Sequence, residues 1–112
     1  MKLDLLVPRP LASEAFRRNR ERFIPTKPGC YALTTFAREV LYIGLTVNLR
    51  RRVNEHLDSA EKTELTIHGR AVLFHWLETT EINKVERTWL NIHLLNEGSL
   101  PVLNSVYSPT ST

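Results

Sequence analysis

Tyrosine, arginine and histidine side chains recur in one stretch of this chain at spacings that suit acid–base and phosphate chemistry. The residues are Tyr31 and Tyr42, each in a β-rich segment, followed by Asn48, Arg52 and His56 at intervals of four. On a helix that interval places the last three side chains on one face. An arginine can hold a phosphate with two donors, and phenol and imidazole groups can exchange protons. The pattern therefore indicates phosphodiester chemistry.

Each of these residues also has an ordinary structural explanation. A lone tyrosine in a strand is usually a core residue with a hydrated hydroxyl, and a lone charged residue is more often structural or neutral than catalytic. The combination of all of them in one short stretch is what favours a functional site.

The tyrosines require two strands, and the polar stripe requires a helix. Strand-forming residues occupy 30–35 and 40–43 with a short turn between them, which predicts a β-hairpin. A helix is expected over 48–58, where three aliphatic residues repeat at the helical period beside the polar stripe. Thr46 or Asn48 can cap its start. The hairpin and this helix would bring the candidate residues together.

An amphipathic helix is predicted before the hairpin, over residues 14–23. Ser13 can cap its N-terminus, and Pro25 would end it. Phe16 and Phe23 would form a narrow apolar face, with arginines elsewhere on the helix.

A third strand and a long helix are predicted after the hairpin. The apolar run 71–77 has the length of a buried strand. The helix is expected over 81–96, capped by Thr79 or Thr80 and followed by Gly98, a residue typical of helix ends. Segment 59–68 is polar, and its pattern assigns it to no element.

Size and charge are those of one small domain with a basic half. The chain has 112 residues, of which 42% are hydrophobic and 24% charged. Residues 1–56 hold eleven Lys or Arg against five Asp or Glu, a net charge of +6, whereas 57–112 hold four against seven, a net charge of −3. An arginine-rich basic half is typical of a nucleic-acid-binding surface, and a solvated arginine-rich face is the simple alternative.

The single cysteine and the short apolar segments favour a cytoplasmic location. Cys30 is the only cysteine, which excludes an internal disulfide, and we expect it to be a small buried strand residue. No segment is long and apolar enough to cross a membrane. Asp4 and two prolines interrupt the apolar residues near the N-terminus, so no secretory signal is expected there.

Five pieces of the sequence, in order, resemble the GIY-YIG nuclease family. They are Pro28-Gly29-Cys30-Tyr31, Leu41-Tyr42-Ile43-Gly44, Asn48-Leu49 with Arg52 and His56, Glu86, and Leu100-Pro101-Val102-Leu103-Asn104. The match spans residues 27–104 and keeps the family's spacing between Tyr42 and Arg52. Within the family, the sequence is most similar in kind to the N-terminal nuclease domain of the bacterial excision-repair incision subunit.

The resemblance implies a fold of the α/β class, of α+β type, with a small three-stranded antiparallel sheet flanked by helices. Together with the pattern and composition of the flanking segments, it divides the chain into an N-terminal extension with a basic amphipathic helix over 1–27, a nuclease-like domain over 28–107 and a loose tail over 108–112. Within the domain, residues 100–104 are expected to be extended.

Three positions depart from the family pattern. Cys30 stands at the middle isoleucine of the first motif, which is a conservative change in a buried strand. Leu45 follows Gly44 where many relatives carry lysine, so that cation is missing. The distance between Glu86 and Asn104 is longer than in the excision-repair relatives.

The resemblance also implies a role for each matched side chain. Glu86 would bind one Mg²⁺ or Mn²⁺, and Arg52 would stabilise the charge that develops on the phosphate. Tyr42 would orient or deprotonate the attacking water with Tyr31 hydrogen-bonded nearby, although the residues alone leave these two roles interchangeable. His56 would hydrogen-bond the phosphate or relay a proton.

Nucleic-acid contacts are expected from further basic and amide side chains: Arg17, Arg18, Asn48, Arg50, Arg51 and Asn104. The implied function is a metal-dependent endonuclease acting on DNA in repair, recombination or restriction, and the sequence does not separate DNA from RNA. Two alternatives stay open. One is a non-catalytic nucleic-acid-binding module of the same fold, and the other is a subunit whose basic helix docks a protein partner or a second copy that supplies targeting.

Overall fold

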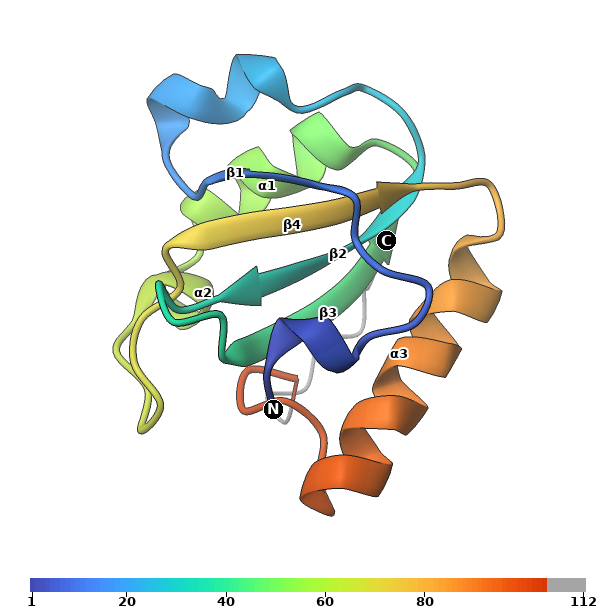
Figure 1. Cartoon of the computed structure of the whole chain (residues 1–112). Helices are drawn as coiled ribbons and strands as arrows, with labels where there is room; N and C mark the ends of the chain where they lie inside the picture. Colours follow the sequence, from blue (N-terminus) through green and yellow to red (C-terminus); the bar gives the residue numbers. More distant parts are fainter. Residues whose placement is uncertain (105–112) are drawn as a thin grey trace.

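The fold is built on one antiparallel sheet of four strands, seen in the computed structural model, which describes residues 1–104. The strands are β1 (Ala12–Ala15), β2 (Gly29–Thr34), β3 (Val40–Thr46) and β4 (Leu73–Glu78), in the spatial order β1-β4-β2-β3 (Figure 1). The predicted fold class is confirmed, and β1 is a strand beyond the three that were expected. The tail predicted over 108–112 lies outside the described residues.

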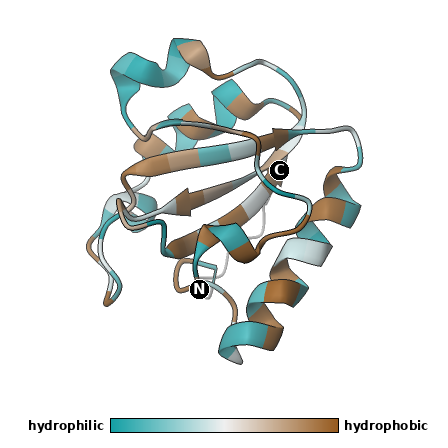
Figure 2. Cartoon of the chain, in the orientation of Figure 1, coloured by the Kyte–Doolittle hydropathy of each residue, from teal (hydrophilic) through white to brown (hydrophobic). Residues whose placement is uncertain are grey.

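Helices cover both faces of this sheet. They are the short 3₁₀ helices η1 (Leu3–Leu5) and η2 (Arg18–Phe23) and the α-helices α1 (Leu49–Leu57), α2 (Ala60–Thr63) and α3 (Ile82–Glu97). One core, which includes Tyr31 and Leu33, lies under α1 and the segments flanking η2, and the other lies under η1 and α3. Figure 2 shows the contrast between the largely hydrophilic η2 and the more apolar strands. No helix within residues 1–104 is long and apolar enough to cross a membrane.

β2 and β3 form the predicted hairpin. Tyr31 pairs with Gly44 and Leu33 pairs with Tyr42, and a register shift follows between Leu33 and Thr34. Arg38 in the connecting turn has a φ of 66°, in the left-handed region. Tyr31 and Leu33 are two residues apart on β2, so their side chains lie on the same face of the sheet. Tyr42 lies opposite Leu33, and both tyrosines are therefore on the face that α1 covers.

The prediction of a helix over residues 14–23 is wrong. Ala12–Ala15 pair with β4, and only Arg18–Phe23 form a 3₁₀ helix. The edge of β4 offers backbone hydrogen-bond partners, which a local sequence pattern cannot reveal. Phe16 is buried in the core on the α1 side whereas Phe23 is 49% exposed, so the two rings do not share one helical face. The basic element before the hairpin is therefore a strand followed by a short 3₁₀ helix.

The C-terminal half follows the predicted order with small shifts. The strand expected over 71–77 is β4, the helix expected over 48–58 is α1 with Asn48 as its N-cap, and the helix expected over 81–96 is α3. Gly98 ends α3 in the left-handed conformation with a φ of 74°, as predicted. The N-cap of α3 is Glu81, whose backbone N–H donates to the Thr79 hydroxyl at 3.0 Å. Thr79 thus supports the start of the helix from outside it.

Residues 102–104 form a turn, so the prediction of an extended segment over 100–104 is wrong. The backbone N–H of Leu103 donates to the Leu41 carbonyl at 2.9 Å, which holds the turn against the outer edge of β3. Leu103 is buried in the core under α1. The segment bends because its backbone hydrogen-bonds to the edge of β3 while Leu103 enters the core.

Candidate active site

Tyr31 is positioned by the glycine that faces it across the hairpin. Its ring is fully buried, and its hydroxyl lies over Gly44. A Cβ atom built on Gly44 would stand 2.5 Å from the Tyr31 Oη, which is closer than real Cβ atoms approach. Glycine at position 44 is therefore what allows the phenol to lie flat across β3 and reach α1.

The Tyr31 hydroxyl connects the two polar residues of α1. Arg52 Nε donates to the Tyr31 Oη at 3.3 Å, and the same oxygen lies 2.6 Å from the His56 Nε2. A guanidinium can only donate, so the phenol oxygen accepts from Arg52. The short contact with the imidazole is a second hydrogen bond of the same hydroxyl. The result is a hydrogen-bond chain that joins Arg52, Tyr31 and His56.

Burial sets the protonation of this chain. It raises the pKa of Tyr31 well above its ordinary value; Tyr42 adds to this shift and Arg52 opposes it. Burial also lowers the pKa of His56 to about 3, assisted by the positive charges of Arg52 and Lys62. At neutral pH the phenol keeps its proton and the imidazole is uncharged, so Tyr31 is not a base and His56 is not a cation.

Tyr42 forms the other wall of the same cluster. Its ring centroid lies 6.0 Å from that of Tyr31 and 5.2 Å from that of His56. The Nζ of Lys62 lies 4.6 Å from the Tyr42 ring centroid. Lys62 comes from α2, in the segment that the sequence pattern assigned to no element, and no periodic or motif signal marked it.

Arg52 carries a local carboxylate partner. Its Nη1 donates to Glu55 Oε1 at 2.9 Å, and Glu55 also lies 3.8 Å from Arg51 Nε. The side chain of Arg52 is 12% exposed. Burial lowers the pKa of Arg52, but the contacts with Tyr31 and Glu55 outweigh it and raise the pKa overall. Arg52 is therefore a permanent cation, held in place at both ends of its guanidinium.

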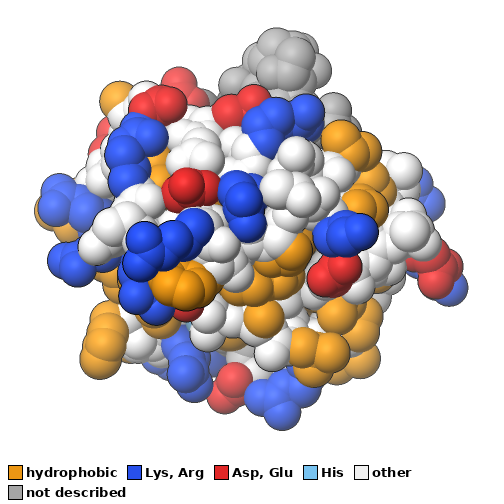
Figure 3. Space-filling model, turned by 90° about the horizontal axis from the view of Figure 1, so that it is seen from above, with side chains coloured by type: hydrophobic (Ala, Val, Ile, Leu, Met, Phe, Trp, Pro, Cys, Tyr) orange, Lys and Arg blue, Asp and Glu red, His pale blue; other side chains and the backbone are white. Residues whose placement is uncertain are grey.

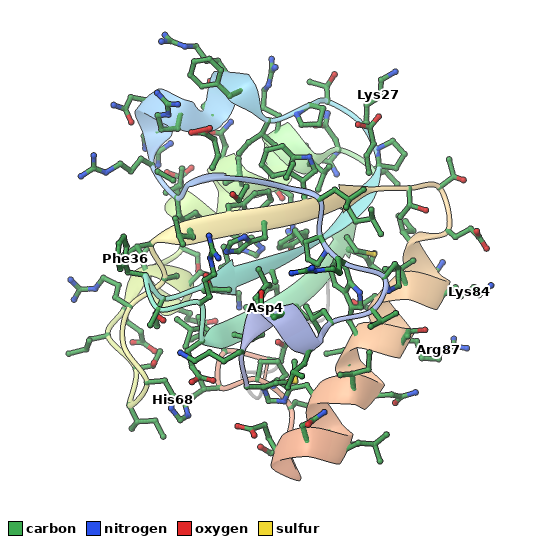
Figure 4. The ribbon with its side chains drawn as sticks, viewed as in Figure 1. Asp4, Lys27, Phe36, His68, Lys84 and Arg87 are labelled. Atoms are coloured by element: carbon green, nitrogen blue, oxygen red, sulfur yellow. The ribbon has the colours of Figure 1, made fainter. Side chains whose placement is uncertain are left out.

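Glu86 lies apart from this cluster. Glu86 is half-buried on α3 and faces Cys30. Because Cys30 and Tyr31 are consecutive in β2, the side chains of these two residues enter opposite faces of the sheet. Burial raises the pKa of Glu86, and Arg87, which points away from the sheet in Figure 4, opposes the shift. The Glu86 carboxylate makes no hydrogen bond or ion pair within residues 1–104. The structure thus brings together four of the five predicted catalytic residues and leaves Glu86 at the same end of β2.

Cys30 is the buried strand residue that was expected. Its side chain is fully buried, and its thiol donates to the Ile82 carbonyl at 3.1 Å. Burial and the nearby Glu86 raise the pKa of the thiol to about 12. A thiol with this pKa is not a nucleophile at neutral pH.

A comparison with protein-family models matches residues 27–95 to the GIY-YIG catalytic domain. This match covers the hairpin, α1, β4 and most of α3. The chain belongs to the GIY-YIG family. The family resemblance of the sequence is thereby confirmed.

Known relatives of this GIY-YIG chain carry the name UvrABC system protein C. The protein from Bdellovibrio bacteriovorus is 29% identical over 108 residues, which is 83% of this chain and 17% of the relative. The proteins from Mesoplasma florum and Finegoldia magna are 35% and 41% identical over 49 and 39 residues, or 44% and 35% of this chain. The chain thus matches only a small part, 6% to 17%, of the length of these relatives.

Glu86 is the one predicted site residue with a carboxylate that could bind the metal ion implied for the GIY-YIG domain. Residues 1–104 contain no group of three or more His, Cys, Asp or Glu side chains that could hold a metal ion. Glu86 is nonetheless a half-buried carboxylate whose oxygens are not used by other described residues. Mg²⁺ binds through one or two carboxylates and keeps several waters when a phosphate supplies further ligands. The residues therefore fit a weak, water-rich site that nucleic acid would complete.

Two of the predicted nucleic-acid contacts in the GIY-YIG domain have structural partners. Asn48 caps α1, and its Oδ1 accepts from the Arg51 backbone N–H at 3.0 Å. Arg50 donates from Nε to the Ile24 carbonyl at 2.8 Å and from Nη2 to the Arg22 carbonyl at 3.0 Å. These bonds join α1 to η2. Binding by Asn48 and Arg50 stays a prediction, and their polar atoms already support the fold.

The polar atoms of Asn104 also form hydrogen bonds within the fold. Its Oδ1 accepts from the Ile43 N–H at 2.9 Å, and its Nδ2 donates to the Ile43 carbonyl at 2.9 Å. The amide therefore closes the edge of β3 like a short strand. Its predicted contact with nucleic acid also stays a prediction.

The remaining predicted contacts lie on an exposed basic surface. Arg17 and Arg18 are exposed, and Arg18 forms an ion pair with Asp58. Arg51 is exposed on α1. Figure 3 shows Lys and Arg side chains spread over the face that carries η2, with acidic side chains between them. This surface is basic but partly neutralised.

Proposed function

We propose that this protein is an endonuclease that hydrolyses phosphodiester bonds in DNA and depends on Mg²⁺ or Mn²⁺. The observation that supports this most directly is the hydrogen-bond chain from Arg52 through Tyr31 to His56, in a GIY-YIG catalytic domain. An arginine that is fixed, charged and 12% exposed is suited to stabilise charge on a phosphate in the transition state.

The two tyrosines have different roles in this proposal. Tyr31 stays protonated and holds Arg52 and His56 in place, so it positions the site. Tyr42 is the group that orients or deprotonates the attacking water, since it lies in the same cluster, is 5% exposed and has no hydrogen bond to Arg52 or His56. His56 keeps the Tyr31 hydroxyl oriented through the hydrogen bond that the two side chains share.

Glu86 would hold the metal ion, with nucleic acid completing the site. When bound, the metal supplies charge stabilisation for the phosphate and lowers the pKa of a coordinated water. Burial raises the pKa of Glu86, so its carboxylate is protonated more readily than an exposed one. Metal binding, and cleavage with it, should therefore weaken at mildly acidic pH.

DNA is the proposed substrate, and repair the proposed setting, because the relatives carry the name of the UvrABC system. The basic surface around η2 supports a nucleic-acid substrate of either kind, so RNA is included in the test. A cytoplasmic location is part of the same proposal. A protein partner or a second copy that supplies targeting is part of the same proposal.

A non-catalytic nucleic-acid-binding module is the second candidate. The observation that favours it is the separation of Glu86 from the cluster, on the other face of the sheet. A binding module would keep the arginines and the fold while cleaving nothing.

Cleavage of supercoiled plasmid, branched DNA and RNA with Mg²⁺ or Mn²⁺ separates the two candidates. We expect DNA nicking that EDTA abolishes and that Glu86→Ala reduces by about a hundredfold or more, because transition-state charge stabilisation is lost. Glu81→Ala, which removes a 68% exposed carboxylate at the N-cap of the same helix, is the matched control and should cleave normally. Undiminished, EDTA-resistant nicking by Glu86→Ala would contradict the proposal, and no cleavage by the wild type on any substrate would favour the binding module.

A further inference from the structure

Lys62 is a buried cation at the site that the proposed mechanism does not use. It lies in α2, its residue is 5% exposed, and its Nζ stands 4.6 Å from the Tyr42 ring centroid. α2 begins three residues after α1 ends, so the fold carries this lysine back over the hairpin. Its aliphatic stem is enclosed by the protein, and its charge faces the candidate base.

The position of Lys62 is costly for the fold. Burial lowers its pKa; Glu61 opposes the shift and Arg52 adds to it. Lys62 forms no ion pair within the described part of the chain, whereas Arg18 and Arg20 each pair with an acid. A buried charge without a partner destabilises a protein, and a ring contact returns only part of that cost. Stability alone therefore does not account for a lysine here.

The ammonium group of Lys62 nevertheless meets solvent. It makes no hydrogen bond to residues 1–104, and every described side-chain nitrogen or oxygen that is shut off from solvent has a hydrogen-bond partner. The Lys62 Nζ is therefore not shut off. An enclosed stem with an ammonium group that reaches solvent and forms no ion pair within residues 1–104 is an arrangement that suits an anion arriving from solvent.

The positive charges of Lys62 and Arg52 both lie close to His56. Both cations lower the pKa of His56, which lies between the tyrosine rings. Leu45, which follows Gly44 in β3, packs into the core on the α3 side and adds no charge. We propose that Lys62 binds the substrate phosphate beside Arg52, as the second cation of the site. This inference rests on the proposed function, because the phosphate is that of a nucleic-acid backbone.

Three variants test this role. Lys62→Met keeps the stem and removes the charge, Lys62→Arg keeps the charge, and Lys84→Met removes a lysine whose side chain is 78% exposed on the outer side of α3 (Figure 4). The measurements are plasmid nicking with Mg²⁺, the thermal unfolding midpoint, and the salt dependence of duplex DNA binding in the Glu86→Ala background.

We expect Lys62→Met to unfold at the same or a higher temperature than the wild type while nicking falls by about tenfold to a hundredfold. Its DNA-binding slope against log salt should fall by about 0.9, as for one lost phosphate contact. Lys62→Arg should recover the slope, and Lys84→Met should match the wild type in all three measurements.

A lower unfolding temperature of Lys62→Met with an unchanged binding slope would overturn the proposal in favour of a structural lysine. Nicking by Lys62→Met equal to that of Lys84→Met, with an active wild type, would overturn it while the nuclease proposal stands. If the wild type binds duplex DNA but cleaves nothing, the nuclease proposal fails and the binding slopes still decide the role of Lys62.

Discussion

At the residue scale, one hydroxyl group organises the site. The Tyr31 Oη accepts from Arg52 and shares a hydrogen bond with His56, and it does so only because Gly44 leaves room for the ring. The sequence predicts that these residues are close, since hairpin pairing and helical spacing are local patterns. It cannot predict these hydrogen bonds or the depth of burial, because both depend on how α1 packs on the sheet.

Tyr31→Phe removes the hydroxyl and keeps the ring. The buried Nε2 of His56 would lose its partner, so we expect the free energy of unfolding to fall by about 1–3 kcal/mol. DNA nicking should fall as well, because Arg52 loses the acceptor that orients it. Urea unfolding and a nicking assay measure the two effects.

Tyr42→Phe is the companion variant. It removes a hydroxyl that makes no bond to Arg52 or His56, so nicking should fall with a smaller loss of stability. Equal stability of Tyr31→Phe and the wild type would argue against the hydrogen-bond chain.

At the element scale, polar side chains join the pieces that carry the site. Arg50 ties η2 and the segment after it to α1, and Asn104 ties the last turn to the edge of β3. Both residues were predicted to contact nucleic acid, Arg50 as a basic side chain and Asn104 as part of a segment that resembles the family. A sequence pattern cannot separate an amide that binds a ligand from one that closes a sheet edge.

Asn104→Ala decides between these two uses. We expect the free energy of unfolding to fall by about 1–3 kcal/mol, because the Ile43 N–H and carbonyl lose their partners at the edge of β3. The salt dependence of DNA binding should stay as in the wild type. Asn83→Ala, on the exposed side of α3, is the control and should be as stable as the wild type. A reduced salt slope with unchanged stability would restore Asn104 as a binding residue.

At the scale of the whole molecule, two buried neutral histidines link stability to pH. Burial lowers the pKa of His56 to about 3, and burial, with Arg38 adding to it, lowers that of His75 to about 4. The two side chains lie on opposite faces of the sheet, one at the Tyr31 hydroxyl and one at the Thr34 hydroxyl. In the unfolded chain both would titrate at about 6.5.

Stability should therefore be full above pH 6.5 and fall as the pH drops toward the folded pKa values. Below 6.5 the unfolded chain takes up protons that the folded protein does not, so each histidine contributes a slope of up to about 1.4 kcal/mol per pH unit. Urea unfolding between pH 7.5 and pH 5 measures the slope. His75→Gln should remove about half of it, and a slope that this variant leaves unchanged would contradict the burial of a neutral His75.

The sequence by itself determined the cluster of candidate catalytic residues Tyr31, Tyr42, Arg52 and His56, the hairpin, and the helices α1 and α3. These depend on periodicity, on turn residues and on spacing, which are local. Only the tertiary structure decided that residues 12–15 become a fourth strand, that Glu86 faces Cys30 on the far side of the sheet, and that Lys62 reaches Tyr42. Those features depend on which backbone edges and which faces meet, and elements far apart in the chain supply them.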